Sequence, residues 1–152
     1  AQETTSLIEE TVTRAGEGYC WGDNGVGNLG DGTFRRSGGP VTTPVKVAGN
    51  LTWKSITAAV FVTCGVTVDG SGHCWGGNVM GERGNGQTSS PDIATPQPIA
   101  GGLKFSAISA DWHNCGVTAD GGAYCWGLGD FGALGNGDTT GRNTPTPVAG
   151  PR

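Results

Sequence analysis

The sequence predicts an all-β fold made of a unit of about 51 residues that occurs three times. The 152 residues include 30 glycines. Because each interior glycine costs a helix about 1 kcal/mol relative to alanine, a helical bundle is excluded. The tripeptide Cys-Trp-Gly occurs three times, and its tryptophans are 54 and 51 residues apart (Trp21, Trp75 and Trp126). A recurrent motif at nearly constant spacing indicates a repeat architecture.

Composition excludes several other classes. The glycines follow no G-X-Y period, which excludes collagen. Charged residues are only 14 % of the chain, and five Trp, four Phe and two Tyr argue against disorder. No stretch approaches the roughly 18 apolar residues of a membrane span. The net charge is −4 and the basic residues are scattered, so we expect no membrane span and no nucleic-acid partner.

A set of glycines follows each of these tryptophans at the same four offsets. The three sets are Gly22, Gly27, Gly30 and Gly32, then Gly76, Gly81, Gly84 and Gly86, then Gly127, Gly132, Gly135 and Gly137. We therefore predict a single repeat domain over residues 1–152, with units of about 16–57, 58–109 and 110–152.

Each unit has the pattern of three or four short strands. Residues 51–56 and 103–108 alternate apolar and polar side chains, which is typical of a half-buried strand. An Asp-Gly pair follows each of these segments (Asp69-Gly70 and Asp120-Gly121), and this pair favours a hairpin turn. Three or four short strands in about 51 residues are typical of one β-propeller blade.

The N-terminal segment 5–15 supplies a strand to a blade that is split between the two termini. Its Val12 lies nine residues before Trp21, as Val66 and Val117 lie nine before their own tryptophans. The 21 residues from Gly150 through both termini to Cys20 nearly equal the 24 and 23 of the complete units. Two interpretations follow: a segment of a longer propeller chain, or a protomer that joins its neighbours head to tail into a ring or filament.

Four of the five cysteines form two pairs around the Asp-Gly turns. Cys64 and Cys74 are ten residues apart, as are Cys115 and Cys125. Residues opposite each other in such a hairpin have Cα atoms about 4.5–5.5 Å apart, a distance that suits a disulfide. We predict two disulfides, with buried reduced thiols as the alternative. Disulfides place the protein in secretions or at the cell surface, and the start at Ala1-Gln2 resembles the end left by signal-peptide cleavage.

The fifth cysteine, Cys20, has Glu10 at its partner position, so it is either a free thiol or an intermolecular bridge. The chain has no C-x-x-C spacing, and His73 and His113 lack partners at ligand spacing, so we expect no metal and no cofactor. No arrangement of nucleophile, base and orienting group is evident, and we expect no enzymatic activity.

Residues 113–137 resemble the regulator-of-chromosome-condensation repeat. That pattern reads approximately H-T-C-x-V-T-x-D-G-x-x-x-C-W-G-x-N-x-x-G-x-L-G-x-G, with Asn114 here in place of Thr. The family builds seven-bladed β-propellers with four-stranded blades, and this chain looks like an extracellular, disulfide-containing type. Two departures concern the middle copy, where Arg83 replaces leucine and Val62 replaces histidine; Gly129 replaces asparagine in the third.

Trp112 is the tryptophan most suited to a binding face. Trp21, Trp75 and Trp126 recur with the repeat and are expected in the core. Trp112, followed by His113, lies where a strand begins. Asn50 opens an Asn-Leu-Thr glycosylation sequon in a predicted loop.

The sequence thus predicts three β-propeller blades of about 51 residues each. We expect a secreted structural protein that self-associates head to tail through the split blade. The alternatives are an extracellular platform that binds another protein, and a fragment of a longer propeller chain.

Overall fold

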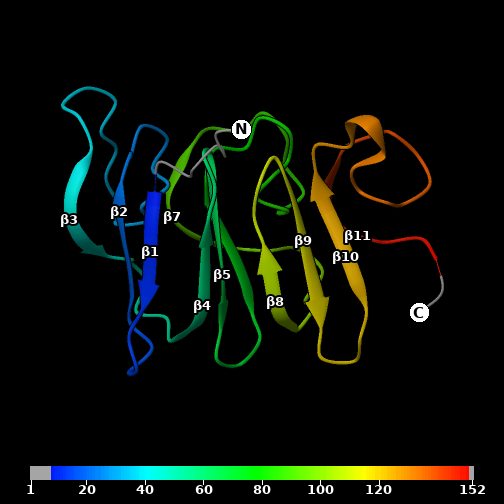
Figure 1. Ribbon diagram of the computed structural model, residues 1–152. Coiled ribbons are helices and arrows are strands. Elements are labelled where there is room, and N and C mark those ends of the chain that lie inside the picture. The colour runs from blue at the N-terminus through cyan, green and yellow to red at the C-terminus, as the bar shows by residue number, and fades with distance from the viewer. Residues whose placement is uncertain (1–7, 151–152) are drawn as a thin grey trace, which may run out of the picture.

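The computed structural model describes residues 8–150, which form three antiparallel sheets that lie side by side (Figure 1). Apart from a short 3-10 helix, η1 (Asp130–Gly132), every element within these residues is a strand. The all-β prediction is confirmed. No helix of the described part is long and apolar enough to cross a membrane.

The first sheet has three strands and the other two have four. The first contains β1 (Ile8–Val12), β2 (Gly18–Gly22) and β3 (Val41–Lys46). The second contains β4 (Trp53–Ala58), β5 (Val62–Thr67), β6 (Gly72–Gly76) and β7 (Ile93–Pro98). The third contains β8 (Phe105–Ser109), β9 (His113–Thr118), β10 (Ala123–Gly127) and β11 (Arg142–Pro147).

The boundaries between the sheets fall at different residues from the boundaries between the predicted sequence units. β4 and β8 each open a sheet, so the connections between sheets are 47–52 and 99–104. The predicted sequence units instead end at about residue 57, within β4, and at about residue 109, the last residue of β8. β1 lies inside the segment 5–15 that was expected to supply a strand, and it pairs with β2 as β5 pairs with β6. Residues 5–7 of that segment lie outside the described residues.

Asp-Gly turns set the register of the hairpins. Asp69 accepts hydrogen bonds from the Thr67 hydroxyl and from the Ser71 N–H, the latter at 3.1 Å. Gly70 has φ +87°, which a side chain would disfavour. The same arrangement recurs at residues 118–122. The turns hold Cys64 directly opposite Cys74, and Cys115 opposite Cys125.

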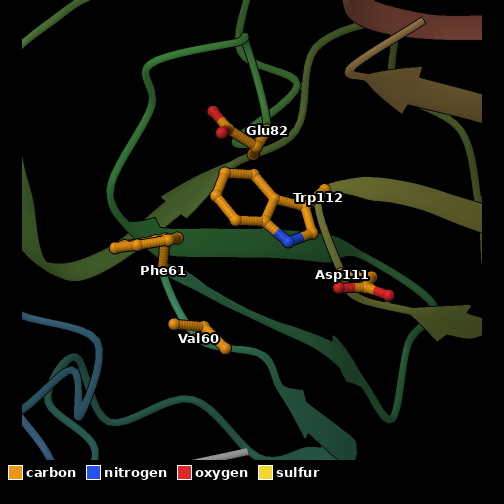
Figure 2. A pocket seen from close by; sticks show the side chains of 5 residues that line it. All are labelled: Val60, Phe61, Glu82, Asp111 and Trp112. Carbon is orange, nitrogen blue, oxygen red and sulfur yellow. The ribbon is translucent and has the colours of Figure 1, made fainter. Parts of the chain in front are cut away.

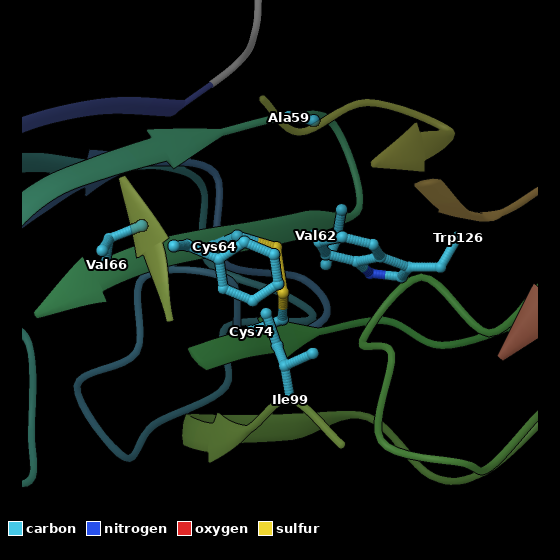
Figure 3. Close-up of a cluster of buried hydrophobic side chains, with 8 residues drawn as sticks. Ala59, Val62, Cys64, Val66, Cys74, Ile99 and Trp126 are labelled. Atoms are coloured by element: carbon cyan, nitrogen blue, oxygen red, sulfur yellow. A yellow bond between two sulfur atoms is a disulfide. The ribbon is translucent and has the colours of Figure 1, made fainter. Parts of the chain in front are cut away.

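Two hydrophobic cores fill the spaces between consecutive sheets. The core between the first and second sheets contains Ile8, Cys20, Leu29, Val41, Val47, Trp53 and Trp75. The core between the second and third contains Ala59, Val62, Cys64, Val66, Cys74, Ile99, Phe105 and Trp126. Figure 3 shows Trp126 reaching from the third sheet toward Val62. Each core therefore joins two sheets, and no sheet has a core of its own.

Arg83 is fully buried at the position that leucine occupies in the other two copies. Its guanidinium donates to the carbonyls of Gly76 (3.1 Å) and Pro91 (2.8 Å), and to the Ser90 hydroxyl at 2.5 Å. Burial lowers the pKa of this side chain. The substitution thus exchanges apolar packing for hydrogen bonds that hold the loop after β6.

Candidate functional site

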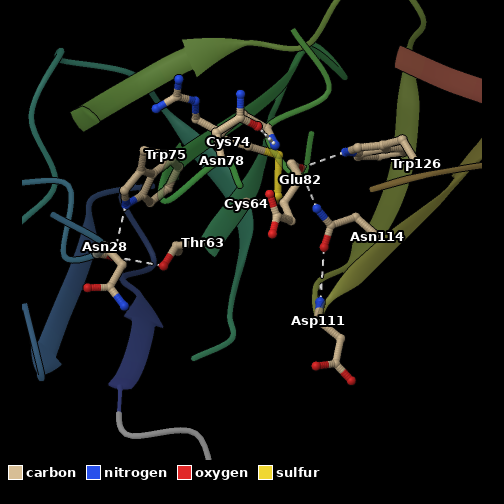
Figure 4. Close-up of a disulfide and its surroundings, with 11 residues drawn as sticks. Asn28, Thr63, Cys64, Cys74, Trp75, Asn78, Glu82, Asp111, Asn114 and Trp126 are labelled. Atoms are coloured by element: carbon tan, nitrogen blue, oxygen red, sulfur yellow. Dashed lines mark hydrogen bonds between the residues drawn. A yellow bond between two sulfur atoms is a disulfide. The ribbon is translucent and has the colours of Figure 1, made fainter. Parts of the chain in front are cut away.

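We call the set of hydrogen bonds that connects two consecutive sheets a joint. The joint between the first and second sheets is centred on one backbone carbonyl. The loop after β2 presents the carbonyl of Asn28 to the second sheet. This oxygen accepts a hydrogen bond from the Trp75 indole N–H at 3.0 Å and another from the Thr63 hydroxyl at 2.7 Å. Figure 4 shows both donors converging on it. Residues more than thirty positions apart in the chain are thereby tied together.

The joint between the second and third sheets repeats this arrangement. The carbonyl of Glu82 accepts from the Trp126 indole N–H at 2.9 Å and from the Asn114 amide at 2.5 Å (Figure 4). Asn28 and Glu82 each lie seven residues after the tryptophan of their own repeat. In both joints the second donor lies opposite the tryptophan in the strand register. A joint therefore consists of two donors from one sheet and one acceptor from the sheet before it.

Two of the periodic glycines make room for the indole. A Cβ atom at Gly30 would lie 2.5 Å from the Trp75 Nε1, and one at Gly84 would lie 2.8 Å from the Trp126 Nε1. Both distances are shorter than real Cβ contacts, so a side chain at either position would displace the tryptophan. The constant offset of this glycine from the Cys-Trp-Gly motif thus reflects packing between sheets.

A further contact links each loop to the outer strand of the next sheet. The Gly32 N–H donates to the Ala94 carbonyl at 2.9 Å, and the Gly86 N–H donates to the Asn143 carbonyl at 2.8 Å. The Asn143 amide also donates to the Gly86 carbonyl at 3.0 Å. Each joint is therefore held at two places, near the tryptophan and near the outer strand.

The outward face of the third sheet carries half of such a joint. Val117 is 44 % exposed, whereas its equivalent Val66, covered by the third sheet, is fully buried. Gly135 is exposed, while Gly30 and Gly84 are buried. Among the described residues, the nearest atom to a Cβ at Gly135 is Val148 Cγ1, at 3.2 Å. The position that an indole fills in the other two joints is thus open to solvent here.

The outward face of the first sheet carries the other half. Trp21 was expected in the core with the other two periodic tryptophans, yet it is partly exposed while Trp75 and Trp126 are fully buried. Glu9 lies opposite Trp21 in the strand register and is exposed. Trp21 is partly exposed because no described sheet covers this face.

Each cysteine lies where the hairpin register predicts. Cys64 is bonded to Cys74 and Cys115 to Cys125, each pair with Cα atoms 4.1 Å apart. Within residues 8–150 the free cysteine is Cys20, which is buried opposite Glu10. Burial, with smaller contributions from nearby carboxylates, raises the pKa of its thiol to about 12. Such a thiol stays protonated and inaccessible, which argues against an intermolecular bridge.

An exposed aromatic pair lies at the end of the molecule that carries the long loops. Trp112 is 48 % exposed and packs edge-on against Phe61, with ring centroids 5.0 Å apart (Figure 2). Val60, Glu82 and Asp111 line the depression beside them, whose volume is about 10 Å³. A space of that size holds about one water molecule.

Sequence reasoning singled out Trp112 and missed Phe61. Both lie three residues before the first cysteine of their hairpin, and this shared position was the signal that could have found Phe61. His113 begins β9, opposite Gly127, and is partly buried. Asn50 is exposed in the loop before β4, with φ +51°, and its glycosylation stays a prediction. No group of three or more His, Cys, Asp or Glu side chains within residues 8–150 is placed to hold a metal ion.

Comparison with known proteins points to one family. The model of the regulator of chromosome condensation (RCC1) repeat matches residues 120–152. The ultraviolet-B receptor UVR8 of Arabidopsis thaliana is 35 % identical over 135 residues, which cover 87 % of this chain and 30 % of the receptor. The mitochondrial RCC1 domain-containing protein RUG3 of the same plant is 31 % identical over 150 residues, covering 95 % and 34 %. The chain thus spans about a third of the length of these relatives.

Solved structures agree with this fold. Prp20p of Saccharomyces cerevisiae, studied with its binding to Gsp1p and histones, superposes with a TM-score of 0.83 at 24 % identity over 96 % of this chain and 37 % of its own. Human WBSCR16 gives a TM-score of 0.78 at 20 % identity over 93 % and 35 %. The solved structures show that the fold is of the β-propeller type, and the repeat model, the two plant relatives and the recurring Cys-Trp-Gly motif show that the chain belongs to the RCC1 repeat family.

Proposed function

We propose that this chain is a non-enzymatic structural module that associates with further copies of itself. The first sheet of one copy docks on the third sheet of the next. The observation that carries this proposal is the complementarity of the two outward faces. Trp21 presents an indole equivalent to the two indoles that fill the internal joints. The face around Val117 and Gly135 presents the surface on which such an indole would pack.

The outer edges of the sheets support face-to-face growth. The outer strands β3, β7 and β11 contain Pro44, Pro96, Pro98, Pro145 and Pro147. Proline has no N–H to donate to a neighbouring strand, and it is a common device against edge pairing. Copies of this chain are therefore expected to meet through the faces of their sheets and not to extend each other's sheets.

A head-to-tail contact between different faces leads to a ring or to a filament. It closes into a ring when the rotation between copies allows closure, and otherwise it continues into a filament. Two copies would bring together six sheets. Each contact would add one more joint of the kind that already connects the sheets of a single copy.

Sedimentation velocity over a range of concentrations tests the proposal, and electron microscopy distinguishes rings from filaments. Val117→Glu places a charge on the open face of the third sheet and should give a monomer. Val68→Glu is the matched control, since Val68 is 66 % exposed in a hairpin turn away from both faces, and it should associate as the unmodified chain does. A folded chain that stays monomeric up to millimolar concentration, or equal association of both variants, would overturn the proposal.

We also propose that the protein is secreted or displayed at the cell surface. The two cysteine pairs at bonding distance support an oxidising compartment. Alkylation of the protein from its native source under denaturing, non-reducing conditions should modify one cysteine, Cys20. Modification of all five would contradict the proposed location.

A second candidate function is an extracellular platform that binds another protein. The exposed Phe61–Trp112 pair favours it, because tryptophan is enriched at the energetic centres of protein interfaces. Trp112→Ala separates the two functions. Loss of a captured partner with unchanged self-association supports the platform, and unchanged capture excludes Trp112 from it.

A further inference from the structure

We infer that Glu9 sets the strength of head-to-tail docking, because it faces the next copy where a hydrogen-bond donor is needed. The inference rests on the proposed function. It concerns the hydrogen-bond donors that a sheet must carry in order to dock on the open face of the third sheet. The two internal joints of this chain supply the comparison.

Both internal joints use two donors on one carbonyl. The indole N–H is one donor in each case. The other comes from the residue opposite the tryptophan, which is Thr63 in the first joint and Asn114 in the second. A hydroxyl donates in the first joint and an amide in the second, so donors of different shape fit this position.

The third copy carries a backbone carbonyl at the equivalent position beside its open face. Ala133 lies seven residues after Trp126, as Asn28 and Glu82 follow their own tryptophans. The loop differs in having a 3-10 helix at Asp130–Gly132 and Gly129 in place of asparagine, but two hydrogen bonds at the following glycine are preserved. The Gly135 N–H donates to the Gly132 carbonyl at 3.0 Å, and the Ala149 N–H donates to the Gly135 carbonyl at 2.7 Å, just as around Gly30 and Gly84. The carbonyl of Ala133 is thus placed to receive an indole N–H and a second donor.

The first sheet supplies only one of these donors. Trp21 carries the indole, but the residue opposite it in the register is Glu9. An ionised carboxylate accepts hydrogen bonds and donates none. In the head-to-tail joint it would face a carbonyl oxygen, so two acceptors would oppose each other where the internal joints form a hydrogen bond. The open face is therefore a better fit for a sheet of this repeat type that carries Thr, Asn or Gln at this position.

Three substitutions at Glu9 test this inference. Glu9→Gln keeps the shape and adds an amide donor, and Glu9→Thr installs the residue of the second copy. Glu9→Ala is the control, because it removes the charge without adding a donor. A hydrogen bond in place of two opposed acceptors should tighten self-association by roughly tenfold. Glu9→Ala should give a smaller gain. Because Glu9 is exposed, all three variants should keep the melting temperature of the unmodified chain when it is measured at a concentration at which every protein is monomeric.

The outcomes separate the inference from the proposed function. The inference is supported when Glu9→Gln and Glu9→Thr associate more tightly than Glu9→Ala and lose that advantage on combination with Trp21→Ala. It is overturned when the unmodified chain associates through the Val117 face but Glu9→Gln gains no more than Glu9→Ala. If no variant associates, the proposed function and this inference are both overturned.

Discussion

Glu10→Cys should create a third disulfide, with Cys20, in the hairpin that lacks one. Glu10 lies directly opposite Cys20 in the register, as Cys64 lies opposite Cys74. The separation of ten residues is the same as in both existing pairs. Because the backbone of β1 and β2 already pairs in this register, the new bond should form without displacing either strand.

The expected gain follows from the length of the closed loop. Closing ten residues removes conformational entropy from the unfolded chain worth about 2.7 kcal/mol at 25 °C. For a chain of this size that gain corresponds to a rise in melting temperature of about 5–10 °C. Glu10 is itself partly buried, and burial is the main reason that its pKa is raised. The substitution therefore removes a carboxylate from a site that disfavours its charge, together with the hydrogen bond that this carboxylate accepts from the Ala58 backbone.

Refolding in a glutathione buffer followed by non-reducing peptide mapping would detect the bond. Glu9→Cys is the matched control, since Glu9 lies opposite Trp21 on the other face of the sheet and its thiol should not pair with Cys20. Urea unfolding with and without reductant would then measure the gain. A Glu10→Cys protein that stays reduced, or that oxidises without added stability, would refute the assignment of this register.

Three further outcomes are expected. A hydrogen bond from the Thr67 hydroxyl is the main cause that lowers the pKa of Asp69 to about 2. Its stabilising contribution is therefore complete above about pH 5 and is lost as the pH falls toward 2, so the melting temperatures of Asp69→Asn and the unmodified protein should converge between pH 5 and pH 2. Cys20 should react with iodoacetamide at pH 8 only on unfolding, because burial raises the pKa of its thiol to about 12, and rapid labelling of the native protein would contradict its burial. Gly30→Ala should lower the free energy of unfolding by about 1–3 kcal/mol more than Gly32→Ala, as measured in urea. Both glycines have positive φ, but a Cβ at Gly32 meets no atom within 4 Å whereas one at Gly30 overlaps the indole of the next sheet; equal losses would exclude the proposed packing role.

The hairpins and their cysteine pairs were predictable because they depend on short-range geometry. An Asp-Gly turn sets which residues are opposite, and alternation along a strand then decides which side chains share a face. The five-residue distances from Asp69 to Cys64 and to Cys74 were therefore enough to place the pair. The same counting placed Glu10 opposite Cys20.

The joints were not predictable in the same way, because their acceptors are backbone carbonyls. Any residue has a carbonyl, so Asn28 and Glu82 carry no signal in their side chains for this role. The constant offset of Gly30 and Gly84 was visible in the sequence, but its cause is an indole from the following sheet. The buried position of Arg83 likewise depends on carbonyls brought near it by a loop.

The two outward faces differ in polarity, and this difference bears on how the chain associates. Repeat proteins keep their ends soluble when the terminal faces are polar. The first sheet presents Glu9 and Thr11 beside Trp21, whereas the third presents Val117 and Val148. The first face can therefore remain in water between contacts, while the third gains more from being covered. Association should then depend chiefly on burial of the apolar outward face of the third sheet. Glu9, on the first sheet of the second copy, should limit the affinity of this contact.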